Sequence, residues 1–288
     1  MEHILSLSYG KDSLACLGAI EELGWPLDRI VHAEVWATDT IPADLPPMVE
    51  FKKKADQIIK ERWGIEVEHI RAKRTYEERF YSVKTDKAKD RKGMIYGWPF
   101  SVKGAWCNSD VKMPPLKAVQ KGGNVVYIGI ASDEPNRFHN LTDTKKSPLV
   151  EAGWDELFCR RRCEENDLLS PIYTTAARGG CWFCHNQGVD QLRLLRKNYP
   201  ELWALMLKWD KDSPVTFKPG KTIEKQITII NADGEEETIF EKAGYEPGHT
   251  VHDFDERFRL EDEGLLIPGD TKFKWDMLKD DMLNYRWF

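Results

Sequence analysis

The segment Ile4-Leu5-Ser6-Leu7-Ser8-Tyr9-Gly10-Lys11-Asp12-Ser13, residues 4–13, decides how this chain is expected to fold. Its apolar part, Ile4 to Ser8, predicts a short buried strand, and the pattern from Ser13 to Leu23 predicts a helix. The first turn of a helix presents unpaired backbone N–H groups and the positive end of the helix dipole, which together bind anions. We therefore expect a phosphate-binding site where this strand ends.

The polar residues of this loop suit a phosphate ligand. Gly10 lets the backbone approach an anion, and Lys11 adds a mobile positive charge. Ser8 and Ser13 offer hydroxyl donors, and Asp12 is expected either to hold the loop in shape or to bind Mg²⁺. The alternative is a glycine turn that arose by chance and is capped by Asp12 and Ser13. The loop is not a Walker A sequence, because it lacks the Gly-x4-Gly-Lys spacing.

The first half of the chain alternates strand-like and helix-like segments, which is typical of an α/β domain with a parallel sheet. Further strands are expected at residues 30–36, 67–72 and 125–131, and further helices at residues 48–63 and 114–120. Right-handed crossovers between such strands place ligands at the carboxyl ends of the strands. We therefore predict a Rossmann-like parallel sheet flanked by helices.

Three regions are expected along the chain. Residues 1–150 form a nucleotide-binding α/β domain, residues 151–212 form a helical, cysteine-rich segment that completes its site, and residues 213–288 form a small appended C-terminal region. The last region is expected to contain a β-hairpin with a glycine-containing turn at residues 231–234.

The composition is that of an ordinary globular protein. The chain has 288 residues, 41% of them hydrophobic, so it can bury a large core without disulfides or a metal. No apolar run approaches the roughly 18 residues of a membrane helix, and no signal-peptide pattern is present, so we expect a soluble, cytoplasmic protein without membrane contact. The net charge of −6 argues against a surface that binds nucleic acid throughout, but it allows a local basic patch.

At Ser8-Tyr9-Gly10-Lys11-Asp12-Ser13 the chain resembles the PP-loop ATP pyrophosphatase superfamily, whose usual motif is Ser-Gly-Gly-Lys-Asp-Ser. Tyr9 departs from it by standing where the motif has its first glycine. The resemblance implies an adenine nucleotide alpha-hydrolase-like fold, in which the loop holds pyrophosphate and ATP is cleaved between its α- and β-phosphates. All six loop residues would then bind the nucleotide, with Lys11 and Asp12 acting in catalysis and Mg²⁺ accompanying ATP.

Further segments resemble the phosphoadenosine phosphosulfate (PAPS) reductase-like branch, and they occur in the family's order. They are Asp39-Thr40, the stretch from Cys107 to Lys112, and Gly129-Ile130-Ala131-Ser132-Asp133-Glu134 followed by Arg137. Two positions depart from the family pattern, since Ile41 replaces a glycine and Ala131 replaces an arginine. The resemblance covers roughly residues 1–212 and implies nucleotide-binding roles for Asp39, Gly129, Asp133 and Glu134, and a catalytic role for Arg137.

The residues by themselves support part of this interpretation. Asp133, Glu134 and Arg137 form a charged group directly after a predicted buried strand, which is where an α/β sheet keeps its ligands. A solvated loop is the alternative. Lys112 is expected either to contact phosphate or to be an ordinary surface charge.

Five of the six cysteines are candidate ligands of a metal site. Cys181 and Cys184 are separated by two residues, and a tight turn with this spacing can direct both sulfurs at one metal. Cys159 and Cys163 are spaced to share one face of a predicted helix. The predicted ligands are Cys107, Cys163, Cys181 and Cys184, with Cys159 in reserve. Zn²⁺ and a [4Fe-4S] cluster both accept four thiolates, and the resemblance to enzymes that insert sulfur into nucleic acid favours the cluster. The alternatives are buried cysteines that act as small apolar residues, or a redox pair.

A basic segment interleaved with aromatic residues lies between residues 71 and 103. Its members are Arg71, Lys73, Arg74, Tyr76, Arg79, Tyr81, Lys84, Lys87, Lys89, Arg91, Lys92, Tyr96, Trp98, Phe100 and Lys103. Basic residues pair with phosphates and aromatic rings stack on bases, so the segment suits a lid over ATP or a contact with single-stranded nucleic acid. A solvated charged loop is the alternative, because acidic residues interrupt the positive run.

Three functions remain open on the sequence. The first is an enzyme that adenylylates an unidentified acceptor with release of pyrophosphate, after which sulfur or nitrogen displaces AMP. The second is a sulfonucleotide reductase, which would need a nucleophilic thiol near the C-terminus, whereas no cysteine follows Cys184. The third is a non-catalytic nucleotide-binding component of a nucleic-acid modification or defence system. The oligomeric state, a homodimer included, is left open.

Overall fold

The computed structural model describes residues 1–85, 91–99, 105–120, 122–174, 179–230, 236–270 and 273–278. The chain divides into two compact units, and each is described by itself. Unit 1 consists of Met1–Phe80 and Gly104–Cys184, and unit 2 consists of Tyr81–Lys103 and His185–Phe288. These divisions differ from the boundaries expected at residues 150 and 212. Residues 151–184 belong to unit 1 because α6 (Glu156–Glu165) lies against α1 (Lys11–Leu23).

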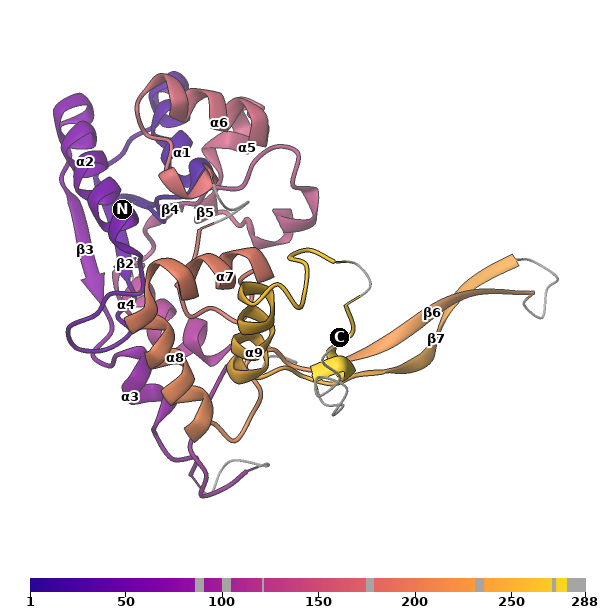
Figure 1. The fold of residues 1–288 in the computed structure, drawn as a ribbon. Helices are drawn as coiled ribbons and strands as arrows, with labels where there is room; N and C mark the ends of the chain where they lie inside the picture. Colours follow the sequence, from indigo (N-terminus) through magenta and orange to yellow (C-terminus); the bar gives the residue numbers. More distant parts are fainter. Residues whose placement is uncertain are drawn as a thin grey trace. The chain divides into compact units, whose positions relative to one another are not determined.

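Unit 1 is built on a five-stranded sheet (Figure 1). In spatial order its strands are β3 (Val67–Arg71), β2 (Arg29–Glu34), β1 (His3–Ser6), β4 (Val125–Tyr127) and β5 (Lys145–Lys146). All neighbouring strands run parallel, and Leu5 of β1 is level with Ile30 of β2 and with Tyr127 of β4. The α/β class and the Rossmann-like parallel sheet predicted from the sequence are confirmed.

Helices cover both faces of this sheet, as the burial of its central strands on both sides requires. On one face, Leu5 and Ile30 belong to an apolar core shared with α1 and α6. On the other face, Ile4 and Val31 pack with Leu116. The helices not yet bounded are α2 (Pro46–Trp63) and α5 (Pro148–Ala152) on the first face, and α4 (Met113–Val119) on the second.

Shorter elements complete unit 1, and they carry several of the residues singled out above. They are α3 (Tyr76–Phe80), the π-helical turn η1 (Cys107–Lys112), and the 3₁₀ turns η2 (Pro135–Asn140) and η3 (Pro171–Thr174). The strand expected at residues 125–131 ends at Tyr127, and Glu134 N–H donates to Ala131 O at 3.2 Å in the turn that follows. Because the chain turns here, Gly129 to Arg137 gather at the carboxyl end of the sheet.

In its described residues, unit 2 combines three α-helices with a two-stranded antiparallel sheet. Its elements are α7 (Val189–Asn198), α8 (Pro200–Asp212), β6 (Lys221–Ile230), β7 (Glu236–Glu246), α9 (Val251–Asp262) and the 3₁₀ turn η4 (Trp275–Leu278). Strands β6 and β7 pair along their whole length, which confirms the predicted hairpin, while its turn at residues 231–234 lies outside the described residues. In the core, the buried Asp210 carboxylate accepts from Trp98 Nε1 at 2.9 Å.

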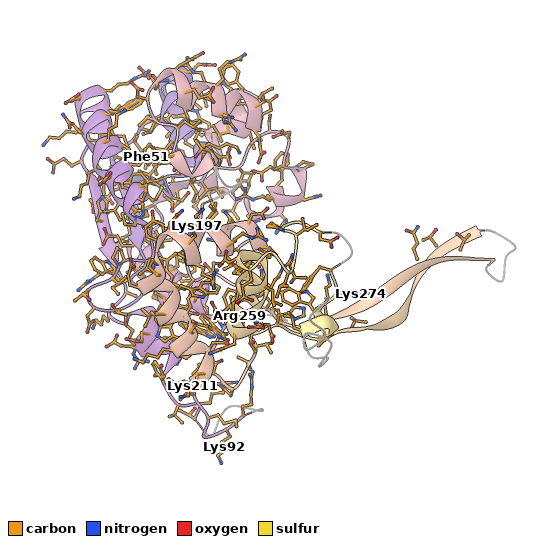
Figure 2. The ribbon with its side chains drawn as sticks, viewed as in Figure 1. Phe51, Lys92, Lys197, Lys211, Arg259 and Lys274 are labelled. Carbon is orange, nitrogen blue, oxygen red and sulfur yellow. The ribbon has the colours of Figure 1, made fainter. Side chains whose placement is uncertain are left out.

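Figure 2 labels Phe51 on α2 and three charged residues, Lys197, Lys211 and Arg259, on α7, α8 and α9. Phe51 of α2 is buried in the core against the sheet of unit 1. Lys197, Lys211 and Arg259 are exposed on α7, α8 and α9. Across the described residues, no helix combines the length and the apolar character that a membrane span requires.

Candidate functional site

A cavity of about 370 Å³ opens at the carboxyl ends of β1 and β2 in unit 1. From β1 the chain continues to β2 on one side, and from β4 it continues to β5 on the other, so the strand order reverses between β1 and β4. Open α/β sheets bind ligands in the crevice at such a point. Eight predicted site residues line this cavity: Ser8, Tyr9, Gly10, Asp12, Ser13, Gly129, Arg137 and Cys181. The predicted phosphate loop, the strand-end segment and one predicted metal ligand therefore share one hollow.

The phosphate loop is held in shape by hydroxyl groups. Ser13 Oγ accepts from Ser8 N at 3.1 Å and from Ser8 Oγ at 3.0 Å, and donates to Gly10 O at 3.0 Å. Gly10 has an extended backbone and precedes α1 as its N-cap. The first turn of α1 thus begins directly at the cavity.

Tyr9 stands where the motif that this loop resembles has a glycine, and it still forms a tight turn. Its backbone is left-handed, with φ 56°, and its side chain is fully buried. The Tyr9 hydroxyl donates to Asp56 and lies 3.2 Å from His69 Nε2. His69 in turn contacts Asp56 at 2.9 Å and Glu34 at 2.8 Å. Burial and the Asp56 carboxylate raise the pKa of Tyr9, so the hydroxyl stays a donor. The strained backbone is therefore offset by a polar network that anchors the side chain.

Replacing Tyr9 by phenylalanine tests this anchor. We expect the free energy of unfolding to fall by about 1–2 kcal/mol, because the variant keeps the ring but loses the hydrogen bond to Asp56. Urea denaturation measures the change. Tyr199→Phe is the control, because the Tyr199 hydroxyl makes no hydrogen bond to any described residue. A Tyr9→Phe protein as stable as the wild type would mean that the network does not hold the loop.

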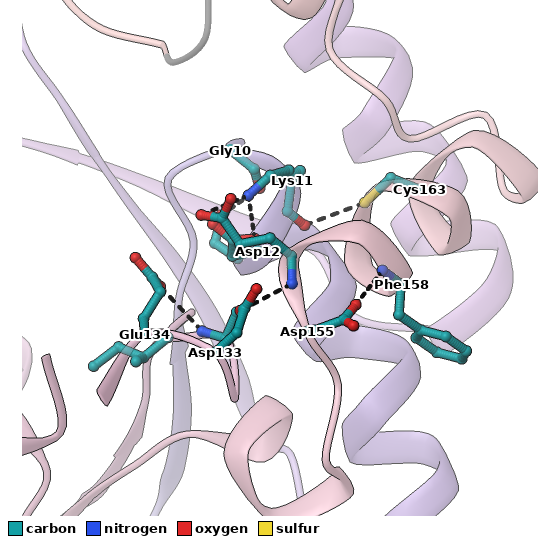
Figure 3. A network of polar contacts seen from close by, with 12 residues as sticks. Gly10, Lys11, Asp12, Asp133, Glu134, Asp155, Phe158 and Cys163 are labelled. Carbon is teal, nitrogen blue, oxygen red and sulfur yellow. Dashed lines mark hydrogen bonds and ion pairs between the residues drawn. The ribbon is translucent and has the colours of Figure 1, made fainter. Parts of the chain in front are cut away.

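The ammonium group of Lys11 forms ion pairs with two carboxylates (Figure 3). Its Nζ lies 2.8 Å from Asp12 Oδ1 and 3.2 Å from Glu156 Oε1. Lys11 is not one of the described residues that line the cavity. Burial alone would lower the pKa of Lys11, but the contacts with Asp12 and Glu156 outweigh it and raise the pKa. The lysine is therefore a firmly charged group at the edge of the cavity.

Three carboxylates gather around this ammonium group. Asp12, Glu134 and Glu156 each offer an oxygen, and these oxygens lie within 4.8 Å of one another. Burial, together with the charges of Glu156 and Glu134, raises the pKa of Asp12 despite Lys11. Carboxylate oxygens are the ligands that Mg²⁺ prefers in proteins, so this donor set fits that ion. No sequence pattern pointed to Glu156.

The remaining strand-end residues have structural partners. Asp133 Oδ1 accepts from Glu156 N at 3.1 Å and so supports the start of α6. Glu134 accepts from Ala131 N at 3.1 Å and pairs with Arg137 at 2.8 Å. Burial would raise the pKa of Glu134, but its bonds to Arg137 and Ala131 hold it below its usual range. Asp39 lies elsewhere, in a small pocket with Glu34, Arg71 and Arg74.

Gly129 brings the end of β4 against the start of α1. A Cβ built at this position would lie 2.6 Å from Ser13 N and 2.7 Å from Asp12 C, which are backbone atoms of the phosphate loop. Real Cβ contacts do not come this close. Glycine is therefore required here by close approach.

Gly129→Ala should push the two backbones apart. We expect the unfolding free energy to fall by about 1–3 kcal/mol, as for other overpacked cores, and the affinity for inorganic pyrophosphate to fall with it. Urea denaturation and calorimetric titration measure the two effects. Gly188→Ala is the comparison, because its nearest neighbour would be Gln191 Oε1 at 3.7 Å, and it should change both quantities less. Equal effects from the two variants would show that the close approach is unimportant.

Several cavity residues carry no sequence signal. Lys52 Nζ lies 2.5 Å from Asp44 Oδ2 and 2.9 Å from His32 Nε2, and all three residues line the cavity. Burial lowers the pKa of His32 to about 3, so the imidazole is neutral and accepts from the lysine. Lys112, left open between a phosphate contact and a surface charge, also lines the cavity. Lys52 and Asp44 were missed because neither belongs to a motif.

Three of the four predicted metal ligands lie near one another. The charge of Cys184 acts on both Cys107 and Cys181, and burial followed by this charge raises the pKa of Cys107 to about 11. Cys184 N donates to Cys181 O at 3.0 Å, which forms the expected tight turn. Among the described residues, the Sγ atoms of these three cysteines do not all lie within 4.8 Å of one another.

Cys163 does not join this group. It is buried on α6, and its thiol donates to Lys11 O at 3.2 Å. It belongs with Cys16 and Cys159 to the apolar core between the sheet and α1. The shared helix face of Cys159 and Cys163 turns toward α1.

Aromatic rings surround the Cys181–Cys184 turn. Tyr76 lies 4.8 Å from Trp106 and 4.2 Å from Phe183, as measured between ring centroids. Trp182 N and Nε1 donate to Ala43 O at 3.0 Å and Pro42 O at 2.9 Å, which fixes the turn against the loop after β2. This apolar shell would limit the access of water to a metal held there.

The basic and aromatic segment is divided between the two units. Tyr76 and Trp98 are each 1% exposed and belong to the cores, so neither is a platform for stacked bases. Lys87, Lys89, Phe100 and Lys103 lie outside the described residues. A contact with nucleic acid stays a prediction.

No model of a known protein family matches this chain, and a search of curated proteins finds no match. A function for the chain must therefore be argued from its own residues and their geometry.

Proposed function

We propose that this chain is a PAPS reductase-like PP-loop enzyme that binds ATP and cleaves it between the α- and β-phosphates. The observation that carries the proposal is that five residues of the loop line the same cavity as Gly129, Arg137 and Cys181; they are Ser8, Tyr9, Gly10, Asp12 and Ser13. The loop, the strand end and Cys181 come from three separate stretches of sequence. Their convergence on one hollow is what a nucleotide site with a neighbouring metal centre requires.

In the proposed reaction an oxygen of the acceptor attacks the α-phosphorus of ATP. The bond from that phosphorus to the bridging oxygen breaks, pyrophosphate leaves, and an adenylylated acceptor remains. Backbone amides at the start of α1, Lys11 and Arg137 stabilise the charge that develops on the leaving pyrophosphate. A sulfur or nitrogen nucleophile then displaces AMP from the acceptor.

Asp12, Glu134 and Glu156 would hold the Mg²⁺ that accompanies ATP, and their carboxylate oxygens suit it. When bound, this ion would neutralise charge on the phosphate oxygens. Lys11 lies among these carboxylates and balances part of their charge before the nucleotide arrives.

Cys107, Cys181 and Cys184 would hold a [4Fe-4S] cluster or Zn²⁺, which we propose takes part in sulfur transfer. Three thiolates leave one position of a four-ligand centre for another group. Cys163 does not suit that position, because its thiol is bonded to Lys11 O. The nearby aromatic shell supports the proposal, since it would shield such a centre.

A sulfonucleotide reductase is the main alternative. It is disfavoured because residues 185–288 contain no cysteine that could act as its nucleophilic thiol. A non-catalytic nucleotide-binding component is disfavoured because Lys11 and Asp12 are both retained.

The products formed from ATP test the proposal. Protein purified without oxygen is incubated with Mg²⁺ and ATP, and the nucleotides and phosphates are separated. Equal amounts of AMP and pyrophosphate support the proposed cleavage, whereas ADP and phosphate contradict it. Sulfite released from PAPS in the presence of a thiol donor would support the reductase instead.

A further inference from the structure

Tyr173 reaches the phosphate loop from a distant part of unit 1. It lies on the short turn η3, and its hydroxyl oxygen accepts the N–H of Lys11 at 2.9 Å. On the other side of the same residue, the thiol of Cys163 donates to Lys11 O. The main chain of Lys11 is therefore held by η3 and by α6 at once.

This contact changes which donors an anion would meet. The N–H of Lys11 belongs to the first turn of α1, whose amides are the expected phosphate donors. Because Tyr173 already accepts this N–H, the amide does not point at open space. A phenolic hydroxyl that accepts through its oxygen still has its own proton to donate. The Tyr173 hydroxyl makes no second hydrogen bond to any described residue.

Tyr173 lies where its hydroxyl proton could be donated to a ligand in the cavity. Tyr173 lines the cavity together with Ser8, Gly10 and Asp12. A Cβ on Gly10 would lie 3.4 Å from the Tyr173 hydroxyl, which is van der Waals contact, so the phenol lies directly beside the loop. Burial raises the pKa of Tyr173, which keeps the hydroxyl protonated at neutral pH.

We infer that Tyr173 is a phosphate-binding residue, whose hydroxyl donates to the pyrophosphate part of the bound nucleotide in place of the Lys11 amide. This inference rests on the proposed function and names a residue of that same site. The Tyr173 hydroxyl oxygen accepts the Lys11 N–H, and the hydroxyl proton is then the donor that a phosphate would meet at the start of α1. The competing arrangement is a hydroxyl that only fills the anion position and must leave before phosphate binds.

Tyr173→Phe separates the two arrangements, because they predict opposite changes in affinity. Inorganic pyrophosphate is titrated calorimetrically into the wild type, Tyr173→Phe and the control Tyr199→Phe. A phosphate-binding Tyr173 predicts about tenfold weaker binding or more in Tyr173→Phe, as expected for a lost hydrogen bond to a charged group, and no change in Tyr199→Phe. Unchanged or tighter binding by Tyr173→Phe would overturn the inference, since a displaced hydroxyl would only compete with the anion.

Folding must be checked alongside, because Tyr173 also bonds to Lys11. The rise in melting temperature that saturating pyrophosphate produces is measured for each protein. A smaller rise for Tyr173→Phe supports the inference even if the variant is less stable by itself, and an equal rise contradicts it. A wild type that binds neither pyrophosphate nor ATP would overturn the proposed function together with this inference, whereas binding by the wild type with an unaffected Tyr173→Phe overturns the inference alone.

Discussion

Lys11→Ala should lower kcat/KM for ATP cleavage by about 10²–10³-fold, the usual cost of removing one charge-stabilising donor from an active site. Lys11 is the first residue of α1, and its Nζ lies 2.8 Å from Asp12 Oδ1. On leaving, pyrophosphate gains negative charge, so a fixed positive group beside it lowers the barrier. Pyrophosphate release under saturating and limiting ATP measures kcat and KM separately.

The control for this variant is Lys60→Ala. Lys60 also forms an ion pair, with Glu66 at 2.5 Å, but it is exposed on the surface of α2. We expect it to leave kcat/KM unchanged. If Lys11→Ala were less stable and yet cleaved ATP at the wild-type rate, Lys11 would only tie Asp12 to Glu156, and the catalytic role would be wrong. Equal rates in a stable Lys11→Ala protein would likewise show that Lys11 takes no part in the cleavage.

Cys181→Ser should remove the bound metal, with at least a tenfold loss of affinity, whereas Cys163→Ser should retain it. Cys181 lines the cavity and interacts electrostatically with Cys107 and Cys184. Cys163 donates its thiol to Lys11 O and lies with Cys16 and Cys159 instead. Iron and zinc are measured in protein purified without oxygen, and the absorbance spectrum distinguishes a cluster from zinc.

Cys16→Ser serves as a matched control, because Cys16 is a fully buried thiol on α1 and is expected to leave the metal content unchanged. Retained metal in Cys181→Ser, or its loss in Cys163→Ser, would contradict the grouping of Cys107, Cys181 and Cys184. A wild type that folds stably and contains neither metal would refute the site itself.

The placement of the phosphate loop was predictable because strand and helix periodicity are local properties. Ile4 to Ser8 and Ser13 to Leu23 show them within a few residues, and a parallel sheet follows from the alternation along the first half. The cysteine pair was also predictable, because two residues of spacing make one turn. The surroundings of Cys163 were not predictable. Spacing shows that Cys159 and Cys163 share a helix face, but it does not show which element that face packs against.

Residues that meet across long sequence separations could not be predicted. Asp44 and Lys52 pair next to Tyr9, and Tyr173 reaches Lys11, without a motif at any of these positions. Asp39 resembled a family element, yet it lies in a pocket apart from the cavity. In the loop after the second strand, Asp44 lines the cavity and Asp39 does not.

The sequence by itself determined the α/β class, the parallel sheet, and the position of the loop where the first strand passes into a helix. These follow from hydrophobic periodicity and turn chemistry, which act over neighbouring residues. Only the tertiary structure decided which groups share the cavity and how the left-handed Tyr9 is anchored. Those outcomes depend on side-chain packing between segments far apart in the chain, and packing is a property of the whole fold rather than of any one segment.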